Sequence, residues 1–258
     1  MLSILIKDYL LDLKMKGSSL HTVENYGFHL DKFAHFLEQN EYTYSDLTAK
    51  QAKLFRNYLV DHGFQSRTVN SILAAVKSFY DFLMEEEAIE GNPIVSSRLR
   101  VKEADILPEF MTMEELQEFN NWLNTRPPFH VALGFRLMLA TGLRVSEAAA
   151  LTPQDVVALG NGGYILRVQH GKGDKERYAP VLDAQVAREL VRFIEGCPER
   201  LPIFRISDRT FKWWAQICRI ETGIPFHSHR CRHTVGTQLL QKGIPIGGLR
   251  TYRYLYNP

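Results

Sequence analysis

The stretch from Ser3 to about Glu87 contains no proline and few glycines, and its apolar residues recur at helical spacing. Both residue types interrupt helices, so their scarcity together with this spacing favours helices over the first third of the chain. Four helices fit it, over Leu2–Lys16, Val23–Asn40, Gln51–Asp61 and from Ser66 to about Glu87. The last helix carries the apolar residues expected at a helix–helix seam: Val69, Ile72, Leu73, Val76, Phe79, Tyr80 and Leu83. The sequence therefore predicts an N-terminal four-helix unit.

Threonines stand where two of these helices are expected to begin. Thr22 is predicted to cap the second helix, because a threonine side chain can accept a hydrogen bond from a free N–H of the first turn. Thr48 and Gln51 have the spacing of a capping box at the start of the third helix.

The composition changes between Ala88 and Pro108, where Gly91-Asn92-Pro93 and a basic run interrupt the helical pattern. We interpret this segment as an extended linker. It divides the chain into an N-terminal domain over residues 1–90, a linker over 91–108 and a second domain over 109–258. Arg98 and Arg100 could lie along a phosphate backbone, although a solvated linker needs no such partner.

After Pro108 the pattern is helical, changes to a period of two, and then becomes helical again. The first two helices are predicted over Met113–Thr125, with Thr112 as cap, and over Phe129–Ala140. The predicted strands, joined by glycine-rich turns, are Val156–Leu159, Tyr164–His170 and Arg177–Pro180. The later helices are predicted over Ala184–Ile194, Ser207–Thr222 and His229–Lys242. The expected fold class is mainly α, of the α+β kind, with a small antiparallel sheet in the second domain.

The composition favours an ordinary soluble protein: of 258 residues, 45% are hydrophobic and 23% are charged. Charged residues from Lys7 onwards interrupt the apolar N-terminus before it could form a signal or membrane span. Three cysteines without a close pair indicate reduced thiols, so we expect a cytoplasmic location. Residues 167–258 carry 16 Lys and Arg against 8 Asp and Glu. This excess suits a phosphate-binding surface, although a solvated basic face is the commoner cause.

Arg144 stands just after a glycine turn at the head of an apolar helix. The apolar run Phe135–Ala140 is broken by Thr141-Gly142, after which apolar residues recur at helical spacing. A guanidinium in such apolar sequence needs an anion or hydrogen-bond acceptors. Glu147, three residues on, is one candidate partner, in which case the role of Arg144 would be structural.

Further basic residues lie downstream. Lys172 stands between two glycines of a turn, from which its side chain can reach outwards, although such turns are common and are weak evidence alone. His229, Arg232 and His233 share one face if their segment is helical. Concentrating these groups costs charge repulsion unless an anion binds, and phosphate is the natural candidate.

The same segment offers a metal-binding alternative, because His229 and His233 are four residues apart, with His227 and Cys231 nearby. The residue after His229 is Arg230, where the zinc peptidase pattern requires a glutamate base. No third acidic ligand follows at useful spacing. We therefore predict that there is no metal site.

Three motifs, in this order, resemble those of the tyrosine site-specific recombinases, the phage integrase and Xer family. Residues 139–151 are similar to the family's first arginine motif, Gly171–Arg177 to its β-hairpin lysine motif, and His229–His233 to its His-x-x-Arg-His box. The helical segment 3–87 resembles the family's SAM-like core-binding domain, which clasps duplex DNA opposite the catalytic domain. The resemblance implies site-specific recombination or integration through a 3′-phosphotyrosyl intermediate, without metal or nucleotide cofactor, by a homo-tetramer on synapsed DNA.

The resemblance also implies roles for single residues. Arg144 and Arg232 would grip the non-bridging oxygens of the scissile phosphate. Lys172 would protonate the leaving 5′-oxygen, and His229 would assist proton transfer or hydrogen-bond the phosphate. The residues expected to orient and buttress these groups are Glu147 and His233. The residues expected to contact DNA elsewhere are Arg98, Arg100, Lys175 and Arg177.

The end of the chain departs from the family pattern. Family members continue from the His-x-x-Arg box through Leu-Gly-His, or a tryptophan in place of that histidine, to a helix with the nucleophilic tyrosine, about thirty or more residues after the arginine. Here Tyr252, Tyr254 and Tyr256 lie 20, 22 and 24 residues after Arg232. We expect a truncated chain impaired in cleavage, its nucleophile unidentified and Tyr256 a weak candidate. The alternative is a non-catalytic DNA-binding protein of recombinase fold.

Overall fold

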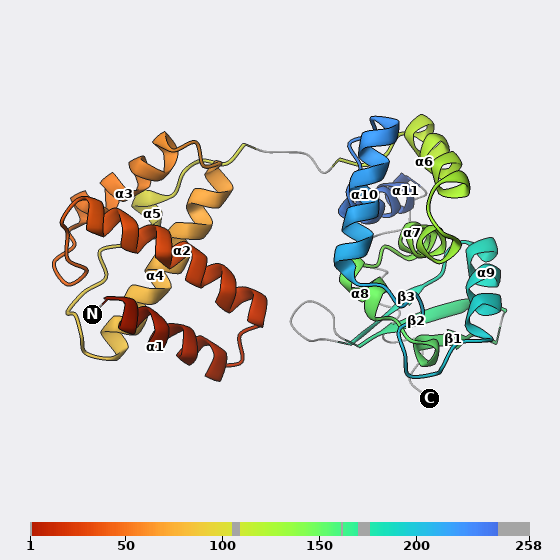
Figure 1. The fold of residues 1–258 in the computed structure, drawn as a ribbon, viewed down its shortest axis with the longest axis horizontal. Helices are drawn as coiled ribbons and strands as arrows, with labels where there is room; N and C mark the ends of the chain where they lie inside the picture. Colours follow the sequence, from red (N-terminus) through yellow and green to blue (C-terminus); the bar gives the residue numbers. More distant parts are fainter. Residues whose placement is uncertain (1, 105–108, 161, 170–175, 242–258) are drawn as a thin grey trace. The chain divides into compact units, whose positions relative to one another are not determined.

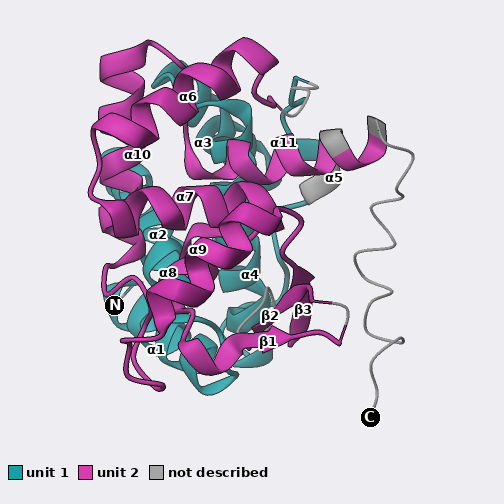
Figure 2. Ribbon diagram, turned by 90° about the vertical axis from the view of Figure 1, so that its right-hand side faces the viewer, with its two compact units in different colours: residues 1–106 teal, residues 107–258 magenta. Residues whose placement is uncertain are grey.

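The computed structural model describes residues 2–104, 109–160, 162–169 and 176–241. The chain divides into two compact units, residues 1–106 and 107–258, which we call unit 1 and unit 2 (Figure 2). Both are built mainly from helices, and a three-stranded antiparallel sheet belongs to unit 2 (Figure 1). The predicted fold class is confirmed. None of the helices in the described ranges combines the length and the apolar character needed to cross a bilayer.

Unit 1 contains four long helices, as predicted. They are α1 (Leu2–Met15), α2 (Leu20–Gln39), α3 (Ala49–Asp61) and α4 (Ser66–Glu85). Helix α4 contacts the other three, because its buried side chains form one wide apolar face. All seven residues predicted for the seam are buried there. Unit 1 therefore has its own hydrophobic core.

Hydrogen bonds at the helix starts fix where α2 and α3 begin. Thr48 and Gln51 form the predicted capping box of α3. Helix α2, in contrast, is capped by Ser19, whose Oγ accepts from the backbone N–H of Thr22 at 3.1 Å. The prediction of Thr22 as cap is wrong, because Ser19 precedes it by one helical turn and leaves Thr22 inside the helix.

Residues 92–103 pack against unit 1 instead of forming the predicted extended linker. Ile94 and Leu99, the latter in the short helix α5 (Ser96–Leu99), are buried in the core of unit 1. The amide of Asn70 on α4 both donates to Val101 O and accepts from Val101 N, each at 2.9 Å. The sequence suggested a linker because Gly91 and Pro93 break the helical pattern. The burial of Ile94 and Leu99 and the hydrogen bonds of Asn70 nevertheless hold the segment against the helices of unit 1. Residues 105–108 lie outside the described residues.

Unit 2 is arranged around helix α7. Its helices are α6 (Met113–Thr125), α7 (Phe129–Thr141), α8 (Val145–Ala150), α9 (Ala184–Ile194), α10 (Asp208–Thr222) and α11 (Ser228–Gln241), with a 3-10 turn η1 (Pro153–Asp155). Helix α7 contacts α6, α8, α9 and α11. It is buried on almost every side, as expected for a helix whose sequence is apolar all round.

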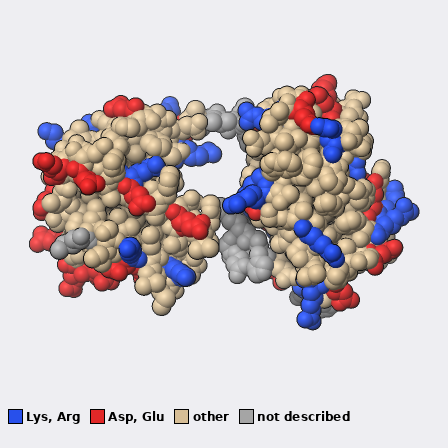
Figure 3. All heavy atoms as spheres, viewed as in Figure 1, with Lys and Arg blue, Asp and Glu red and all other residues tan. Residues whose placement is uncertain are grey.

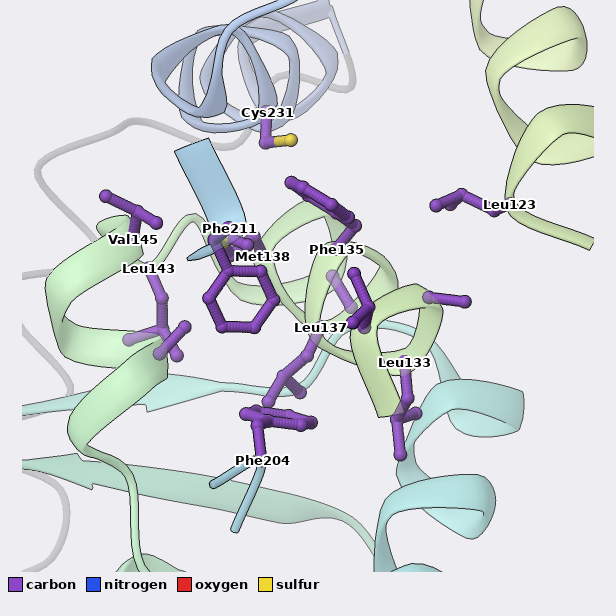
Figure 4. Packing of buried hydrophobic residues seen from close by; sticks show 14 of the residues in the cluster. Leu123, Leu133, Phe135, Leu137, Met138, Leu143, Val145, Phe204, Phe211 and Cys231 are labelled. Atoms are coloured by element: carbon purple, nitrogen blue, oxygen red, sulfur yellow. The ribbon is translucent and has the colours of Figure 1, made fainter. Parts of the chain in front are cut away.

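One glycine of α7 leaves room for an aromatic ring from α10. A Cβ on Gly134 would lie 2.5 Å from two ring carbons of Phe211 on α10, so any larger residue would displace that ring. Phe211 packs edge-on to Phe135 and Phe204 in the centre of unit 2 (Figure 4). The aromatic cluster therefore fixes the distance between α7 and α10.

The sheet has the order β1 (Val156–Ala158), β2 (Tyr164–Val168), β3 (Arg177–Pro180). Val168 and Arg177 form the last residue pair of the β2–β3 ladder before the segment that connects the two strands. After β3, the backbone N–H of Leu182 donates to Ala140 O at 3.0 Å. This bond attaches the sheet to the end of α7, just before the turn that carries Arg144.

Candidate active site

The turn between α7 and α8 sets the position of Arg144. Gly142 ends α7 in the left-handed conformation, with φ 67°, and its N–H donates to Met138 O at 2.9 Å. Thr141 Oγ1 donates to Leu137 O and accepts from the N–H of Leu143, so the turn closes on itself. Arg144 is then the N-cap residue of α8. The sequence expectation of a glycine turn followed by a helix is confirmed.

The buried carboxylate of Glu147 accepts hydrogen bonds from two arginines at this turn. Oε1 accepts from Arg144 Nη1 at 2.8 Å, and Oε2 accepts from the backbone N–H of Arg144 at 2.7 Å. Oε2 also accepts from Arg177 Nη2 at 2.6 Å. The side chain of Glu147 is only 2% exposed, whereas those of Arg144 and Arg177 are 29% and 32% exposed. Each guanidinium therefore keeps part of its fork free.

Helix α11 brings a third arginine to the same turn. Arg232 Nη1 donates to the carbonyl oxygen of Gly142 at 3.0 Å. Burial lowers the pKa of Arg232, and the neighbouring charges of Arg144 and Arg177 lower it further, while Glu147 opposes them. Three guanidiniums and one carboxylate leave a net charge of +2. The protonated arginines repel one another in the free protein, and a bound anion would relieve that repulsion.

His229, one turn before Arg232 on α11, lies in the field of these arginines. Partial burial of its ring is the largest cause that lowers its pKa, followed by the charges of His233, Arg144 and Arg232. The imidazole is therefore neutral at pH 7, and it can accept a proton. His233 is exposed on the same helix.

The neighbouring residues of α11 point elsewhere, which bears on the metal-site alternative. Cys231 is fully buried and faces the aromatic cluster of unit 2 (Figure 4). It therefore cannot share an ion with the exposed His229. Among the residues that the structure describes, no three His, Cys, Asp or Glu side chains are grouped so that they could hold a metal ion.

Other predicted site residues lie apart from this cluster or outside the described residues. Arg98 and Arg100 belong to unit 1, where both are exposed; Arg100 lies 3.6 Å from Glu103, and Arg98 forms no ion pair within the described ranges. Figure 3 shows Lys and Arg side chains on the visible faces of both units, mixed with Asp and Glu. The predicted residues outside the described ranges are Lys172, Lys175, Tyr252, Tyr254 and Tyr256.

Three contributions to the site were not predicted. Arg177 binds Glu147, although the sequence had suggested only a DNA contact. The charge of Lys212 on α10 contributes to the lowered pKa of His229. Arg230 is buried and forms an ion pair with Glu115. The spacing of Thr112 and Glu115 is that of a capping box and could have indicated that the Glu115 carboxylate is held at the start of α6. No pattern in the sequence links Glu115 to Arg230, 115 residues away.

The sequence matches the phage integrase family over residues 109–252 and the phage integrase N-terminal SAM-like domain over residues 6–87. The chain belongs to the phage integrase family. The tyrosine recombinase XerC of Bacillus subtilis is 28% identical over 253 residues, which are 90% of this chain and 81% of that one. XerC of Halalkalibacterium halodurans is 33% identical over 203 residues, 76% of this chain and 64% of that one.

Solved structures share the fold. A lambda integrase dimer bound to a COC′ core site has a TM-score of 0.75 at 18% identity, covering 96% of this chain and 93% of that one. The Tn1549 transposon integrase in complex with circular intermediate DNA has a TM-score of 0.71 at 15% identity, covering 95% and 90%. The predicted family is thus confirmed, and with it the function class, site-specific DNA recombination. At the level of the family, the chemistry is the cleavage and rejoining of DNA.

Proposed function

We propose that this integrase-family chain cleaves and rejoins duplex DNA, at the impaired rate expected while its nucleophile is unidentified, and that Arg144 and Arg232 hold the phosphate at which it does so. The observation that supports this best is the cluster of three guanidiniums around the carboxylate of Glu147. Arg144 comes from the turn before α8 and Arg232 from α11, yet both reach the same turn. Their forked donors match the non-bridging oxygens of a phosphodiester.

The proposed step moves one phosphoryl group. A tyrosine oxygen attacks phosphorus, the bond from phosphorus to the 5′-oxygen breaks, and that oxygen takes up a proton to leave as a 5′-hydroxyl. A 5′-hydroxyl attacking the phosphotyrosyl bond reverses these changes and rejoins the strand. Neutral His229 can accept a proton in the first step, and we propose Lys172 as the donor to the leaving oxygen. His233 is proposed to buttress the site.

The proposed partners are duplex DNA and further copies of this chain. The structural neighbours include a lambda integrase tetramer bound to a Holliday junction, with a TM-score of 0.74. We propose the same assembly, a tetramer on two synapsed DNA sites. Arg98, Arg100 and Lys175 are proposed to contact the phosphate backbone. Charge reversal at Arg98 should weaken binding to all sequences alike, and the affinity should fall steeply with salt concentration.

The test begins with a duplex recovered by binding selection from a pool of random duplexes, which we call the selected duplex. On a nicked form of it, cleavage leaves protein bound covalently to DNA, and the complex survives denaturation. Arg144→Ala and Arg232→Ala should each slow adduct formation by about 10²–10³-fold, while the Kd changes far less. Arg188→Ala, an exposed arginine on α9, is the matched control and should change neither quantity.

The outcomes separate the alternatives. An equal loss of binding and cleavage in Arg144→Ala would mean that this arginine only supports the fold. Specific binding without any adduct would instead favour the non-catalytic DNA-binding protein. If an adduct forms, single changes of Tyr252, Tyr254 and Tyr256 to Phe identify the nucleophile. For Lys172→Ala, a substrate with a 5′-phosphorothiolate, whose sulfur leaves without a proton, should restore cleavage; no recovery would exclude Lys172 as the acid.

A further inference from the structure

Helix α11 has two functional faces. Successive residues of a helix are about 100° apart, so His229, Arg232 and His233 occupy one face. Arg230 and Thr234 occupy another, because they are four residues apart. The first face contributes Arg232 to the candidate active site. The second face is buried: the side chain of Arg230 is 5% exposed, and Thr234 is fully buried.

The buried face is held by the start of unit 2. Arg230 Nη1 and Nη2 donate to the two carboxylate oxygens of Glu115, at 3.2 and 2.9 Å, and Nη2 also donates to Phe110 O at 2.8 Å. Thr234 Oγ1 accepts from the N–H of Met111 at 2.9 Å and donates to Arg230 O at 2.8 Å. The forked contact and the extra carbonyl restrain rotation of α11 better than a single ion pair would.

The carboxylate of Glu115 is itself fixed. Glu115 is the third residue of α6, where its Oε2 accepts from the backbone N–H of Thr112 at 2.9 Å. Thr112 Oγ1 in turn accepts from the N–H of Glu115 at 3.2 Å. Arg230 is thereby anchored to the N-terminal capping box of α6, a rigid point of unit 2.

We propose that Arg230 is a positioning residue, which sets the rotation of α11 and thereby the place of Arg232 and His229 at the phosphate. This inference rests on the proposed function of the site. Side-chain ends lie roughly 5–6 Å from a helix axis, so a rotation of about 10° moves the guanidinium of Arg232 by about 1 Å. A displacement of that size at a reacting centre can cost about 10²-fold in rate.

A matched control exists in the same unit. Arg126, the C-cap residue of α6, forms an ion pair with Glu221 on α10, and so it ties the end of α6 to a helix that does not carry His229 or Arg232. Arg126→Met therefore removes an arginine–glutamate contact of α6 without releasing α11. Arg230→Met removes the arginine–glutamate contact that holds α11. A purely structural role would lower the melting temperature of Arg230→Met more than that of Arg126→Met, because the side chain of Arg230 is 5% exposed and that of Arg126 is 60% exposed, but it would leave the phosphate contact of Arg232 unchanged in both folded variants.

The experiment is phosphate ethylation interference on the selected duplex, which neutralises one phosphate at a time and needs no cleavage. The phosphate bound by Arg232 is the one whose ethylation weakens binding of the parent protein but not of Arg232→Ala. Arg230→Met should lose the interference at this same phosphate and bind the unmodified duplex about tenfold or more weakly. Arg126→Met should keep both the interference at this phosphate and the affinity for the unmodified duplex. Melting curves show that each variant is folded at the assay temperature.

The outcomes are distinguishable. If no phosphate separates the parent protein from Arg232→Ala, the proposed phosphate site itself is wrong, and the positioning role fails with it. If that phosphate is found but its ethylation still weakens binding of Arg230→Met, only the positioning role is overturned. Should Arg230→Met not fold, Arg230→Lys takes its place, because it keeps the charge beside Glu115 and loses the fork and the bond to Phe110 O. Unchanged interference in Arg230→Lys would equally contradict the proposal.

Discussion

Replacing Glu147 with glutamine tests how the three arginines are held together. The substitution keeps the size of the side chain but removes its charge and one of its two acceptor oxygens. Glu147 accepts three hydrogen bonds, two from Arg144 and one from Arg177, and it is 2% exposed. In Glu147→Gln the N–H donors of the new amide face a guanidinium, which offers no acceptor. The cluster of Arg144, Arg177 and Arg232 also loses the carboxylate that compensates its charge.

The expected loss of stability follows from this geometry. Breaking a buried ion pair by removing one partner costs about 3–5 kcal/mol, because the remaining charge stays without compensation. Both guanidiniums are about 30% exposed, so water reaches them and the lower value, about 3 kcal/mol, applies. For a unit of this size the melting temperature should fall by roughly 6–12 °C. The net charge of the cluster rises from +2 to +3, so non-specific DNA affinity should not fall.

Thermal unfolding, followed by circular dichroism, and binding to a random duplex measure the two effects. Glu189→Gln is the control, since Glu189 forms a single ion pair with Arg136 at 3.4 Å and is 24% exposed. This pair should contribute no more than about 1 kcal/mol. The reasoning is refuted if Glu147→Gln is no less stable than Glu189→Gln, or if its non-specific DNA affinity drops.

Three further predictions concern packing, pH and thiol reactivity. Gly134→Ala should destabilise unit 2 by about 1–3 kcal/mol in denaturant unfolding, because the new methyl group meets the ring of Phe211. The pKa of His229 is lowered, so the unfolded chain binds this proton at a higher pH than the folded one; stability from the neutral ring is complete above about pH 6.5 and falls below it. His229→Gln should flatten the melting temperature between pH 7 and 5. Under native conditions iodoacetamide should label Cys197 and leave Cys231 unmodified, because burial raises the pKa of the Cys231 thiol.

Helices could be predicted from the sequence where local signals act alone. The helix over Ala184–Ile194 has the predicted bounds, since its apolar residues keep a strict period and Asp183 caps it. Residues 92–103 show where local signals fail. Gly91 and Pro93 end a helix correctly, but whether the chain then leaves the unit depends on tertiary contacts such as those of Asn70 with Val101. Such contacts have no period in the sequence.

The site shows the same limit more sharply. Arg230 and Arg232 are two residues apart and chemically identical, yet one is buried against Glu115 and the other reaches the turn at Gly142. Helical geometry predicts that they face different directions, but not which direction leads to the proposed phosphate site. The two histidines on the face of Arg232 favoured that residue, and the resemblance to a family then gave it a role at the phosphate. The contact of Arg177 with Glu147 could not be found from spacing, because 30 residues and a change from helix to strand separate them.

The three arginines also differ in how the free protein compensates their charge, and this difference has a measurable consequence. Arg144 and Arg177 have the carboxylate of Glu147, whereas Arg232 has a carbonyl oxygen and a lowered pKa. Removing the charge of Arg232 relieves repulsion, while removing the side chain of Arg144 takes one charged hydrogen bond, that from Nη1 to Oε1, away from the buried carboxylate of Glu147. In the DNA-free protein, Arg232→Met should therefore melt at a temperature equal to or above that of the parent, and Arg144→Met should melt below it. A greater loss in Arg232→Met would show that its bond to Gly142 O outweighs the repulsion. The expected order would support the proposed role of Arg232 at the phosphate, because the residue would then lower the stability of the DNA-free protein.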